Sequence, residues 1–254
     1  MTLTFLGTGT SSGVPVIGCD CAVCTSGDPR NTRYRASVWL RWDEISVVVD
    51  TGPEFRLQAL RAGIRTVDAL LLTHDHADHI FGLDDVRFFQ LRGRREMPLY
   101  GDARTVGVIR RAFKYIFDGP LIPGTFRPTL APHDVEGPFS LFGRTVIPIP
   151  ICHGQLPILG YRIGGCAYLT DCSRIPEGSE ALLQGLDVLV LGALRHRPHP
   201  THFSLPQAVA AAQRLNPRRT YFTHIGHELD HEATERDLPA GFHIAYDGLT
   251  LDIE

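Results

Sequence analysis

The chain has 254 residues, of which 43% are hydrophobic and 21% are charged. Its 25 Lys and Arg residues and 28 Asp and Glu residues leave a net charge of −3 at neutral pH. This composition excludes a disordered chain, a collagen-like repeat and a long coiled coil, and the nearly neutral charge gives no general attraction to nucleic acid. Twelve histidines and six cysteines stand beside only two methionines and two tryptophans, so the histidine surplus is the most unusual feature of the composition.

The beginning of the chain and its apolar segments predict a cytoplasmic protein. Met1 leads directly into residues 3–6, without the basic start and the long apolar core of an export signal. The longest apolar stretch, residues 186–194, contains Asp187 and is too short to span a bilayer. In the cytoplasm, cysteines are more often metal ligands or unreactive thiols than disulfides.

Short strand-like segments alternate with helix-like segments along the chain. In chain order, the pattern predicts strands at 2–6, 36–41, 45–50, 69–73, 98–100, 145–150, 159–163, 166–170, 188–191, 220–223 and 243–246. It predicts helices at 53–62, 105–116, 177–183 and 205–215, the last with Ser204 as its N-cap. The segment 118–138, rich in Gly and Pro, has the weakest pattern and lies between two halves of similar content. We expect a layered α/β fold in one domain, residues 1–254, which two related halves could form.

Polar residues follow five of the predicted strands at their carboxyl ends. Asp50, His74, His153, Asp171 and His224 occupy these positions. In layered α/β proteins this edge of the sheet is where sites usually form. The five side chains are therefore candidates for one site.

One short segment concentrates further metal-ligand candidates. His74, His76, Asp78 and His79 lie within six residues, directly after an apolar strand. The spacing of His74 and His76 lets an extended loop turn both rings toward one ion, while Asp78 and His79 turn toward another. Imidazole and carboxylate ligands suit Zn, Mn or Fe(II). One ion cannot readily use this segment and the strand-end groups together, whereas two ions about 3.5–4 Å apart could, as in two-metal hydrolases.

Residues 73–79, Thr-His-Asp-His-Ala-Asp-His, resemble the T-H-x-H-x-D-H signature of the metallo-β-lactamase superfamily. The single residues that follow later in the chain are similar to the superfamily's later motifs in order and spacing. The resemblance covers essentially the whole chain and implies an αββα sandwich with a dinuclear site for two divalent ions, Mn²⁺ or Zn²⁺. The ligands it implies are His74, His76 and His153 on one metal, Asp78, His79 and His224 on the other, and Asp171 as a bridge. Asp50 matches an acidic motif that supports a ligand from behind.

Three cysteines, Cys19, Cys21 and Cys24, lie in the loop 18–25. Thiolates at this spacing suit a structural zinc ion, which needs a fourth ligand. Three unrelated thiols are the alternative, and a redox pair is disfavoured because no thioredoxin-like βαβ unit surrounds the loop. His227 is the candidate fourth ligand, because it lies three residues after a candidate metal ligand and has no place in the dinuclear set.

One branch of the superfamily shows the same three elements. Leu-Gly-Thr-Gly at 6–9, the cysteine loop and the T-H-I-x-H element at 223–227 resemble the phosphodiesterase family that acts on phosphoribosyl 1,2-cyclic phosphate in the carbon–phosphorus lyase pathway. This resemblance implies phosphonate breakdown as the setting, and one structural Zn²⁺ held by Cys19, Cys21, Cys24 and His227. The other cysteines, Cys152, Cys166 and Cys172, are expected to be buried thiols.

The segment 195–204 supplies a candidate proton donor. It contains His196, His199 and His202 between a predicted strand and a predicted helix. His202 is fixed best, because it closely precedes the helix N-cap, and it matches the catalytic histidine of the phosphodiesterase family. A histidine poised near neutral pH can protonate a departing oxygen. We therefore expect His202 to be the general acid and the other two to be surface histidines, while the two arginines of the segment are candidates for a phosphate clamp.

These residues together predict a metal-dependent phosphodiesterase, in which a hydroxide bridging two metals attacks phosphorus and His202 protonates the leaving oxygen. The resemblance implies a small-molecule phosphodiester, such as phosphoribosyl 1,2-cyclic phosphate, as the substrate. Two alternatives stay open, a nuclease that processes RNA 3′ ends and a non-catalytic zinc-stabilised binding module. The string His-Glu-Ala-Thr at 231–234 resembles a motif of tRNA 3′-processing endonucleases, but it follows His224 instead of preceding the last metal ligand. We expect neither a membrane nor nucleic acid as a partner and leave a homodimer open.

Overall fold

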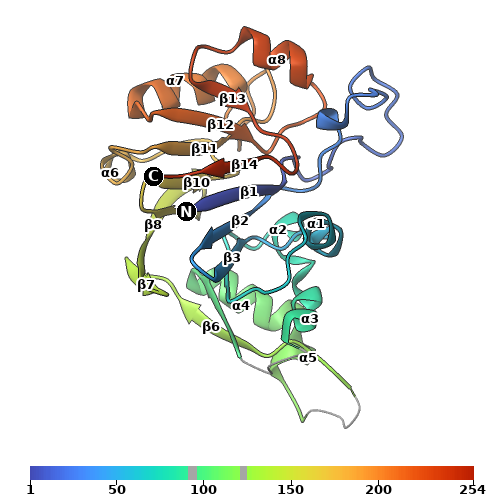
Figure 1. Ribbon diagram of the computed structural model, residues 1–254, viewed down its shortest axis with the longest axis vertical. Coiled ribbons are helices and arrows are strands. Elements are labelled where there is room, and N and C mark those ends of the chain that lie inside the picture. Colours follow the sequence, from blue (N-terminus) through green and yellow to red (C-terminus); the bar gives the residue numbers. More distant parts are fainter. Residues whose placement is uncertain (91–95, 121–124) are drawn as a thin grey trace.

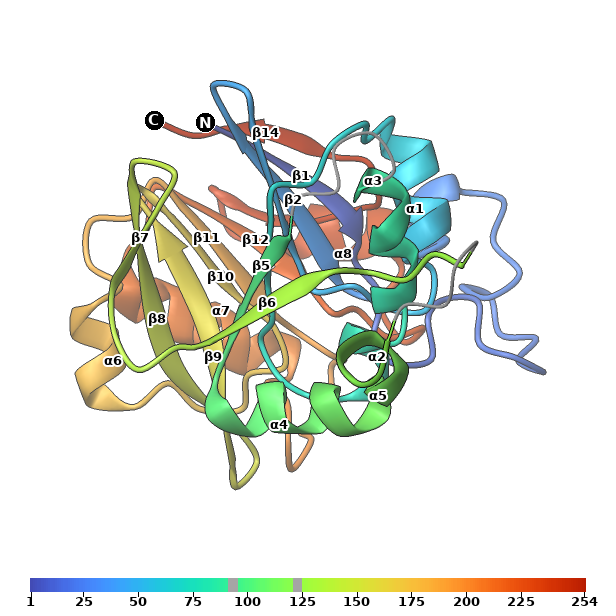
Figure 2. The same cartoon turned by 90° about the horizontal axis from the view of Figure 1, so that it is seen from below.

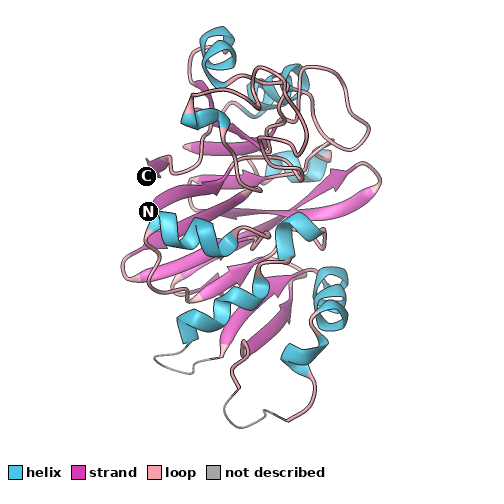
Figure 3. Cartoon of the chain, turned by 90° about the vertical axis from the view of Figure 1, so that its right-hand side faces the viewer, coloured by secondary structure: helices cyan, strands magenta, loops and turns pink. Residues whose placement is uncertain are grey.

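Two mixed sheets, each of seven strands, pack face to face (Figure 1, Figure 3). The computed structural model describes residues 1–90, 96–120 and 125–254. The first sheet has the order β14-β1-β2-β3-β4-β5-β6, with β1 (Thr2–Gly7), β2 (Ser37–Trp42), β3 (Ile45–Val49), β4 (Ala69–Leu71), β5 (Met97–Gly101), β6 (Leu130–Asp134) and β14 (Thr250–Asp252). The second has the order β13-β12-β11-β10-β9-β8-β7, with β7 (Phe139–Leu141), β8 (Arg144–His153), β9 (Leu156–Ile163), β10 (Cys166–Leu169), β11 (Val188–Gly192), β12 (Arg219–Thr223) and β13 (Phe242–Ile244).

Both sheets follow the same succession of strand directions. In the first sheet, neighbours from β14 to β3 pair antiparallel and neighbours from β3 to β6 pair parallel. In the second, neighbours from β7 to β10 pair antiparallel and neighbours from β10 to β13 pair parallel. The last strand, β14, returns to pair with β1, so the two chain ends lie side by side (Figure 1). Apart from β14, each half of the chain therefore builds one sheet.

Helices cover the outer faces of both sheets, as the view from below also shows (Figure 2). The first sheet carries α1 (Phe55–Ala62), α2 (Ala77–Ile80), η2 (Leu83–Val86), α3 (Arg87–Gln90), α4 (Ala103–Ala112) and α5 (Lys114–Phe117). The second carries α6 (Glu177–Ala181), α7 (Leu205–Leu215) and α8 (His231–Asp237), and the short η1 (Pro29–Asn31) lies in the loop between β1 and β2. The predicted αββα sandwich is confirmed. None of the helices in the described ranges has the length and apolarity that a membrane crossing requires.

The strand β3 shows how the sequence builds these layers. Successive side chains of a strand point to opposite faces of the sheet. Val47 and Val49 pack into the core between the two sheets, whereas Val48 packs under the helices of the first sheet. All three side chains are fully buried, so the strand is apolar without interruption, as is typical of sheets covered on both faces.

Several predicted elements differ from the structure. The helix expected at 105–116 is interrupted at Phe113, whose φ of −110° and ψ of 43° separate α4 from α5. The segment 118–138 contains β6, which is held by parallel pairing with β5, and residues 121–124, which lie outside the described ranges. The unpredicted strands β7 and β14 have three residues each and exist through pairing with β8 and β1. Such edge strands depend on their neighbours more than on their own sequence pattern.

Candidate active site and metal centre

Three candidate site residues follow strands with a left-handed backbone. Asp50 comes directly after β3 with a φ of 63°, Asp171 comes just after β10 with a φ of 53°, and His224 comes directly after β12 with a φ of 60°. Such a conformation costs a residue other than glycine about 1–3 kcal/mol, and it persists where the surrounding structure fixes it, often at functional sites. The three turns bring side chains from both sheets to one shared edge.

Four histidine rings of the predicted ligand set lie side by side at this edge. The ring centroids of His74 and His76 are 4.5 Å apart, and those of His74 and His79 are 4.2 Å apart. The ring of His153, at the end of β8, lies 5.1 Å from that of His76 and 5.7 Å from that of His74. His76 is exposed and the other three are buried, so the cluster opens to solvent beside His76.

Two carboxylates complete the cluster. Asp171 places Oδ2 at 3.2 Å from Nε2 of His79 and Oδ1 at 3.1 Å from Nε2 of His224. Asp78 places Oδ2 at 3.2 Å from Nε2 of His79 and at 3.8 Å from Nε2 of His224. Asp171 belongs to two groups of potential ligands, one with Asp78, His79 and His224 and the other with His153 and His202, as a shared ligand would.

Hydrogen bonds behind the rings fix which nitrogen faces the centre. The Nδ1 atom of His79 donates to Oδ2 of Asp50 at 2.7 Å, and Asp50 also accepts from the amide and hydroxyl groups of Thr73. The Nδ1 atom of His153 donates to two backbone carbonyl oxygens, among them that of Thr201 at 2.8 Å. A ring protonated at Nδ1 offers its Nε2 lone pair to a metal. Asp50 therefore lies behind the ring of His79, a candidate ligand.

The unpaired atoms of the cluster fit bound metal ions. Within the described residues, the Nε2 atoms of His74, His79 and His224 are buried and have no hydrogen-bond partner. Burial opposes a charge on His79, but nearby carboxylates, that of Asp171 first among them, outweigh it and raise the pKa of this ring well above its usual value. Buried carboxylates require cations, and a mixed set of nitrogen and oxygen donors suits Zn²⁺ or Mn²⁺.

His202 lies against this cluster, on the loop between β11 and α7. Its ring is 4.6 Å from that of His153 and stacks at 4.8 Å on that of His224. Its Nδ1 atom is 3.9 Å from Oδ1 of Asp171. Burial, followed by the neighbouring His224, lowers the pKa of His202 to about 3. The predicted proton donor is therefore at the site, and its ring is neutral at neutral pH in the absence of a bound anion.

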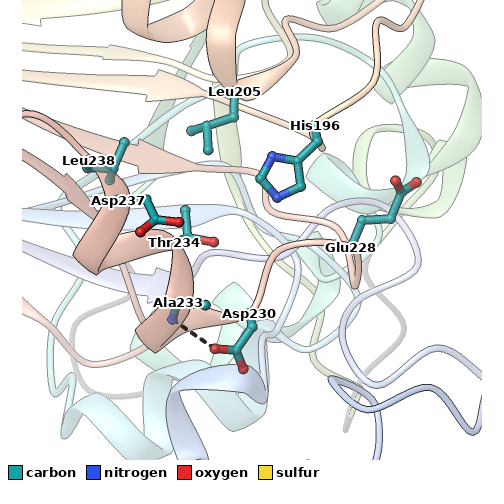
Figure 4. A pocket seen from close by; sticks show the side chains of 8 residues that line it. All are labelled: His196, Leu205, Glu228, Asp230, Ala233, Thr234, Asp237 and Leu238. Carbon is teal, nitrogen blue, oxygen red and sulfur yellow. Dashed lines mark hydrogen bonds between the residues drawn. The ribbon is translucent and has the colours of Figure 1, made fainter.

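The loop between β11 and α7 is held by contacts that sequence reasoning missed. Arg195 donates to the carbonyl oxygens of Arg197 and Pro198 and lies 3.8 Å from Glu228. Arg197 lies 3.2 Å from the same carboxylate, so Glu228 engages both arginines that were candidates for a phosphate clamp. Glu228 and the exposed His196 line a separate cavity of about 190 Å³ beside α8 (Figure 4). No motif marks Glu228, because its role depends on a loop about thirty residues earlier in the chain.

The cysteine loop forms a second ligand cluster and projects at the right of Figure 1, in blue. The sulfur atoms of Cys19, Cys21 and Cys24 lie 3.3, 3.5 and 3.4 Å from Nδ1 of His227. A tetrahedral zinc ion with ordinary bond lengths separates sulfur and nitrogen by about 3.5 Å, so the spacing fits one ion. The backbone N–H of Cys24 lowers the pKa of Cys21 to about 6, which favours the thiolate that zinc binds.

The remaining cysteines only partly match their prediction. Cys166 and Cys172 are buried, and burial raises the pKa of the Cys166 thiol to about 12. Cys152 is only half-buried, because its sulfur lies near the end of β8 and accepts a hydrogen bond from Arg174 at 3.1 Å. The expectation that Cys152 is a buried thiol was therefore wrong.

The His-Glu-Ala-Thr string forms the start of α8. Its histidine, His231, is buried, packs against Tyr246, and places Nδ1 at 3.2 Å from the Arg33 guanidinium. The backbone N–H of His231 donates to the side chain of Asn31 at 2.9 Å. These contacts tie α8 to the loop that follows the cysteines, so His231 has a packing role.

Comparisons with known proteins agree with this geometry. Residues 46–225 match the family model of the β-lactamase superfamily domain. The crystal structure of a diphosphatase from the PhnP family is 51% identical, with a TM-score of 0.93 over 98% of this chain and 96% of that chain. An octanoyltransferase of Porphyromonas gingivalis is 38% identical over 257 residues, which are 100% of this chain but 52% of that protein, so the chain spans about half its length. Zinc-bound PqqB from Methylobacterium extorquens, 21% identical with a TM-score of 0.80 over 100% of both chains, shares the fold.

The four-layer fold and the clustered histidines and carboxylates define a metal-dependent hydrolase of the metallo-β-lactamase type. The family match spans the segment from Asp50 to His224, which carries every residue of the predicted dinuclear set. The chain belongs to the metallo-β-lactamase superfamily and, within it, to the PhnP family. The assignment of each ligand to one metal ion stays a prediction.

Proposed function

We propose that the protein hydrolyses a P–O bond of a small phosphate diester, with a cyclic phosphodiester such as phosphoribosyl 1,2-cyclic phosphate as its substrate. The observation that carries this proposal is the position of His202, whose ring contacts both His153 and His224. An alkoxide is a poor leaving group, and a proton donor beside the metal ligands is what its departure requires.

The proposal includes the metal ions and the residues that would hold them. We infer two divalent ions, Mn²⁺ or Zn²⁺, one held by His74, His76 and His153 and the other by Asp78, His79 and His224, with Asp171 shared. When bound, the two ions lower the pKa of water toward neutrality and offset the phosphoryl charge. Asp50 and the Thr201 carbonyl keep the rings of His79 and His153 turned toward the centre. A third, structural Zn²⁺ belongs to Cys19, Cys21, Cys24 and His227.

His202 acquires its proton together with the substrate in this proposal. Burial and the neighbouring His224 lower its pKa to about 3 in the free site. An anionic phosphate beside the ring favours the charged imidazolium and raises this pKa. Asp171, with Oδ1 at 3.9 Å from Nδ1 of His202, acts in the same direction. The charged ring then donates its proton to the departing oxygen.

Turnover of four substrates in parallel tests the reaction class. The substrates are a ribosyl 1,2-cyclic phosphate, an aryl phosphodiester, a pre-tRNA and an octanoyl thioester, each with Mn²⁺ or Zn²⁺. We expect hydrolysis of the first two. Cleavage of the pre-tRNA alone would favour the nuclease, and metal binding without any hydrolysis would favour the binding module. The thioester is included because one relative is an octanoyltransferase, and turnover of the thioester alone would overturn the proposal.

The variant His202→Ala tests the proton donor. On the ribosyl cyclic phosphate, kcat should fall by roughly 10²–10⁴-fold while the metal content stays unchanged. An aryl oxide is a weaker base than a sugar alkoxide, so the aryl phosphodiester should show a smaller loss. An unchanged rate on the cyclic substrate would remove His202 from the mechanism.

Hydrolysis of a diphosphate is the second candidate, because a 51%-identical relative is a diphosphatase of the same family. The same metal centre would serve, but the departing group would be phosphate, which is a much weaker base than an alkoxide. Diphosphate hydrolysis should therefore depend little on His202. A strong preference for diphosphates, with nearly full activity in His202→Ala, would favour this second function.

The setting of the reaction belongs to the same proposal. We propose phosphonate breakdown in the cytoplasm as this setting and a single domain over 1–254 as the unit that carries the activity. The net charge of −3 supports a small phosphate ester over a polynucleotide as the substrate. Neighbouring genes for phosphonate breakdown would support the setting independently of any assay.

A further inference from the structure

The loop between β11 and α7 holds a second ordered histidine, His199, which the proposed reaction does not use. Its ring centroid lies 5.1 Å from that of His202. His202 in turn contacts the rings of His153 and His224. Among the described residues, His199 has ring contact with His202 and with none of the metal-ligand candidates. His199 therefore extends the histidine cluster by one ring, which packs on His202.

The proton of His199 sits on Nε2. The backbone N–H of Thr201 donates to Nδ1 of His199 at 3.3 Å, and the Thr201 hydroxyl lies 3.2 Å from the same atom. A ring nitrogen that accepts from an amide carries a lone pair, so the neutral ring carries its proton on the other nitrogen. Burial, followed by Arg195, lowers the pKa of His199 and keeps the ring neutral. In the described part of the chain, Nε2 has no partner and is not fully buried, so its N–H is a free donor.

Thr201 also fixes His199 relative to the metal centre. Its carbonyl oxygen accepts the Nδ1 proton of His153 at 2.8 Å, while its amide holds His199. The turn between β8 and β9 packs closely against Thr201, since a Cβ atom added at Gly154 would lie 2.9 Å from Cγ2 of Thr201. One residue thus connects a candidate metal ligand to the free donor of His199.

We propose that His199 is a substrate-binding residue whose Nε2–H donates to an oxygen of the sugar phosphate that carries the leaving group. His202 protonates the leaving oxygen, so the remainder of that sugar lies next to His202, and His199 is the neighbouring ring that the proposed metal ions and proton transfer leave free. The Arg195 guanidinium also acts on His199 electrostatically, and its positive charge, which Glu228 at 3.8 Å offsets in part, favours an anionic phosphate oxygen over an uncharged acceptor. This inference rests on the proposed phosphodiesterase function.

Two variants separate binding from loop support. In His199→Asn, the amide oxygen replaces Nδ1 as the acceptor for Thr201, but no atom stands in the place of Nε2. In His199→Gln, the amide NH₂ stands near the place of Nε2, but the acceptor for Thr201 is lost. His196→Asn is the matched control, because His196 is an exposed histidine of the same loop that lines the separate cavity.

We expect His199→Asn to raise KM for the ribosyl cyclic phosphate by roughly 10- to 100-fold with kcat unchanged, as loss of a hydrogen bond to a charged group predicts. His199→Gln should keep most of the affinity, and His196→Asn should behave as the wild type. Neither His199 variant should change KM for an aryl phosphodiester, which has no sugar. An unchanged KM in His199→Asn, or equal losses of kcat on both substrates, would overturn the proposal.

A binding measurement keeps this test independent of turnover. Histidine ¹⁵N NMR of the zinc-loaded protein should show the Nε2–H form of His199, and ribose 5-phosphate should shift that signal. Ribose as a second probe distinguishes a sugar hydroxyl from the phosphate as the acceptor. Failure of the proposed function would appear as no hydrolysis of any phosphate ester by the wild type. Failure of the His199 proposal would appear as no shift with either probe.

Discussion

Replacement of Asp50 by asparagine tests how the metal centre orients its ligands. Asp50 is fully buried and accepts from Nδ1 of His79 at 2.7 Å and from the amide and hydroxyl of Thr73 at 2.9 and 2.8 Å. Asparagine has the same shape and tolerates the left-handed backbone at this position, where φ is 63°. The substitution therefore changes the hydrogen-bonding pattern with little change in packing.

The altered pattern acts on His79. If the new amide oxygen still accepts the hydrogen bond from the Thr73 N–H, the NH₂ group faces Nδ1 of His79. That nitrogen then becomes the acceptor of a hydrogen bond from the NH₂ group. The ring proton then moves to Nε2, the atom that lies 3.2 Å from both Asp78 and Asp171. A protonated Nε2 cannot bind a metal ion. A hydrogen bond to a charged group contributes about 1.5–3 kcal/mol, so metal binding should weaken by roughly 10- to 100-fold.

Competition for Zn²⁺ with a coloured chelator measures this change. We expect Asp50→Asn to lose affinity at the exchangeable sites and to keep the ion of the cysteine loop. Urea unfolding of the metal-free protein is the control for folding. Equal metal affinity in variant and wild type would refute the reasoning about the His79 tautomer, and loss of the cysteine-loop ion as well would indicate general unfolding instead.

Three further predictions concern the zinc loop, the core and the turn beside Thr201. Burial raises the pKa of Cys24 to about 11, so this thiol is protonated at neutral pH and must release its proton when zinc binds. The zinc affinity of the loop should therefore rise about tenfold per pH unit between pH 6 and 8 from this thiol alone, and a pH-independent affinity in a chelator titration would contradict this. Phe222→Ala removes a fully buried ring from the core under α7. The free energy of unfolding in urea should fall by about 3–5 kcal/mol, and a fall of less than about 1 kcal/mol would contradict the packing. Gly154→Ala adds a Cβ atom at a φ of 63°, and this atom would lie 2.9 Å from Cγ2 of Thr201. The substitution should therefore lower activity and metal affinity together. Wild-type values of both would show that the turn can shift freely.

Much of the metal centre could be predicted from the sequence because its ligands are grouped locally. His74, His76 and His79 need no long-range contact to meet, since one short loop carries them. Apolar runs mark the strands that precede Asp50 and Asp171, so the ends of those strands were recognisable as well. The edge strands and the break at Phe113 were missed, because pairing partners and packing decide them, and neither is encoded in a local pattern.

The histidines between β11 and α7 show the limit of sequence reasoning most clearly. The sequence by itself set the residue types, so it determined that this chain could carry a metal centre, a cysteine loop and a nearby proton donor. It could not separate the roles of His196 and His199, which both looked like surface residues. Only the tertiary structure placed His196 beside α8 and His199 against His202, because Thr201 joins that loop to His153 across almost fifty residues of chain. Contacts of that kind form only when the second sheet packs, so they cannot be predicted from the sequence of either segment alone.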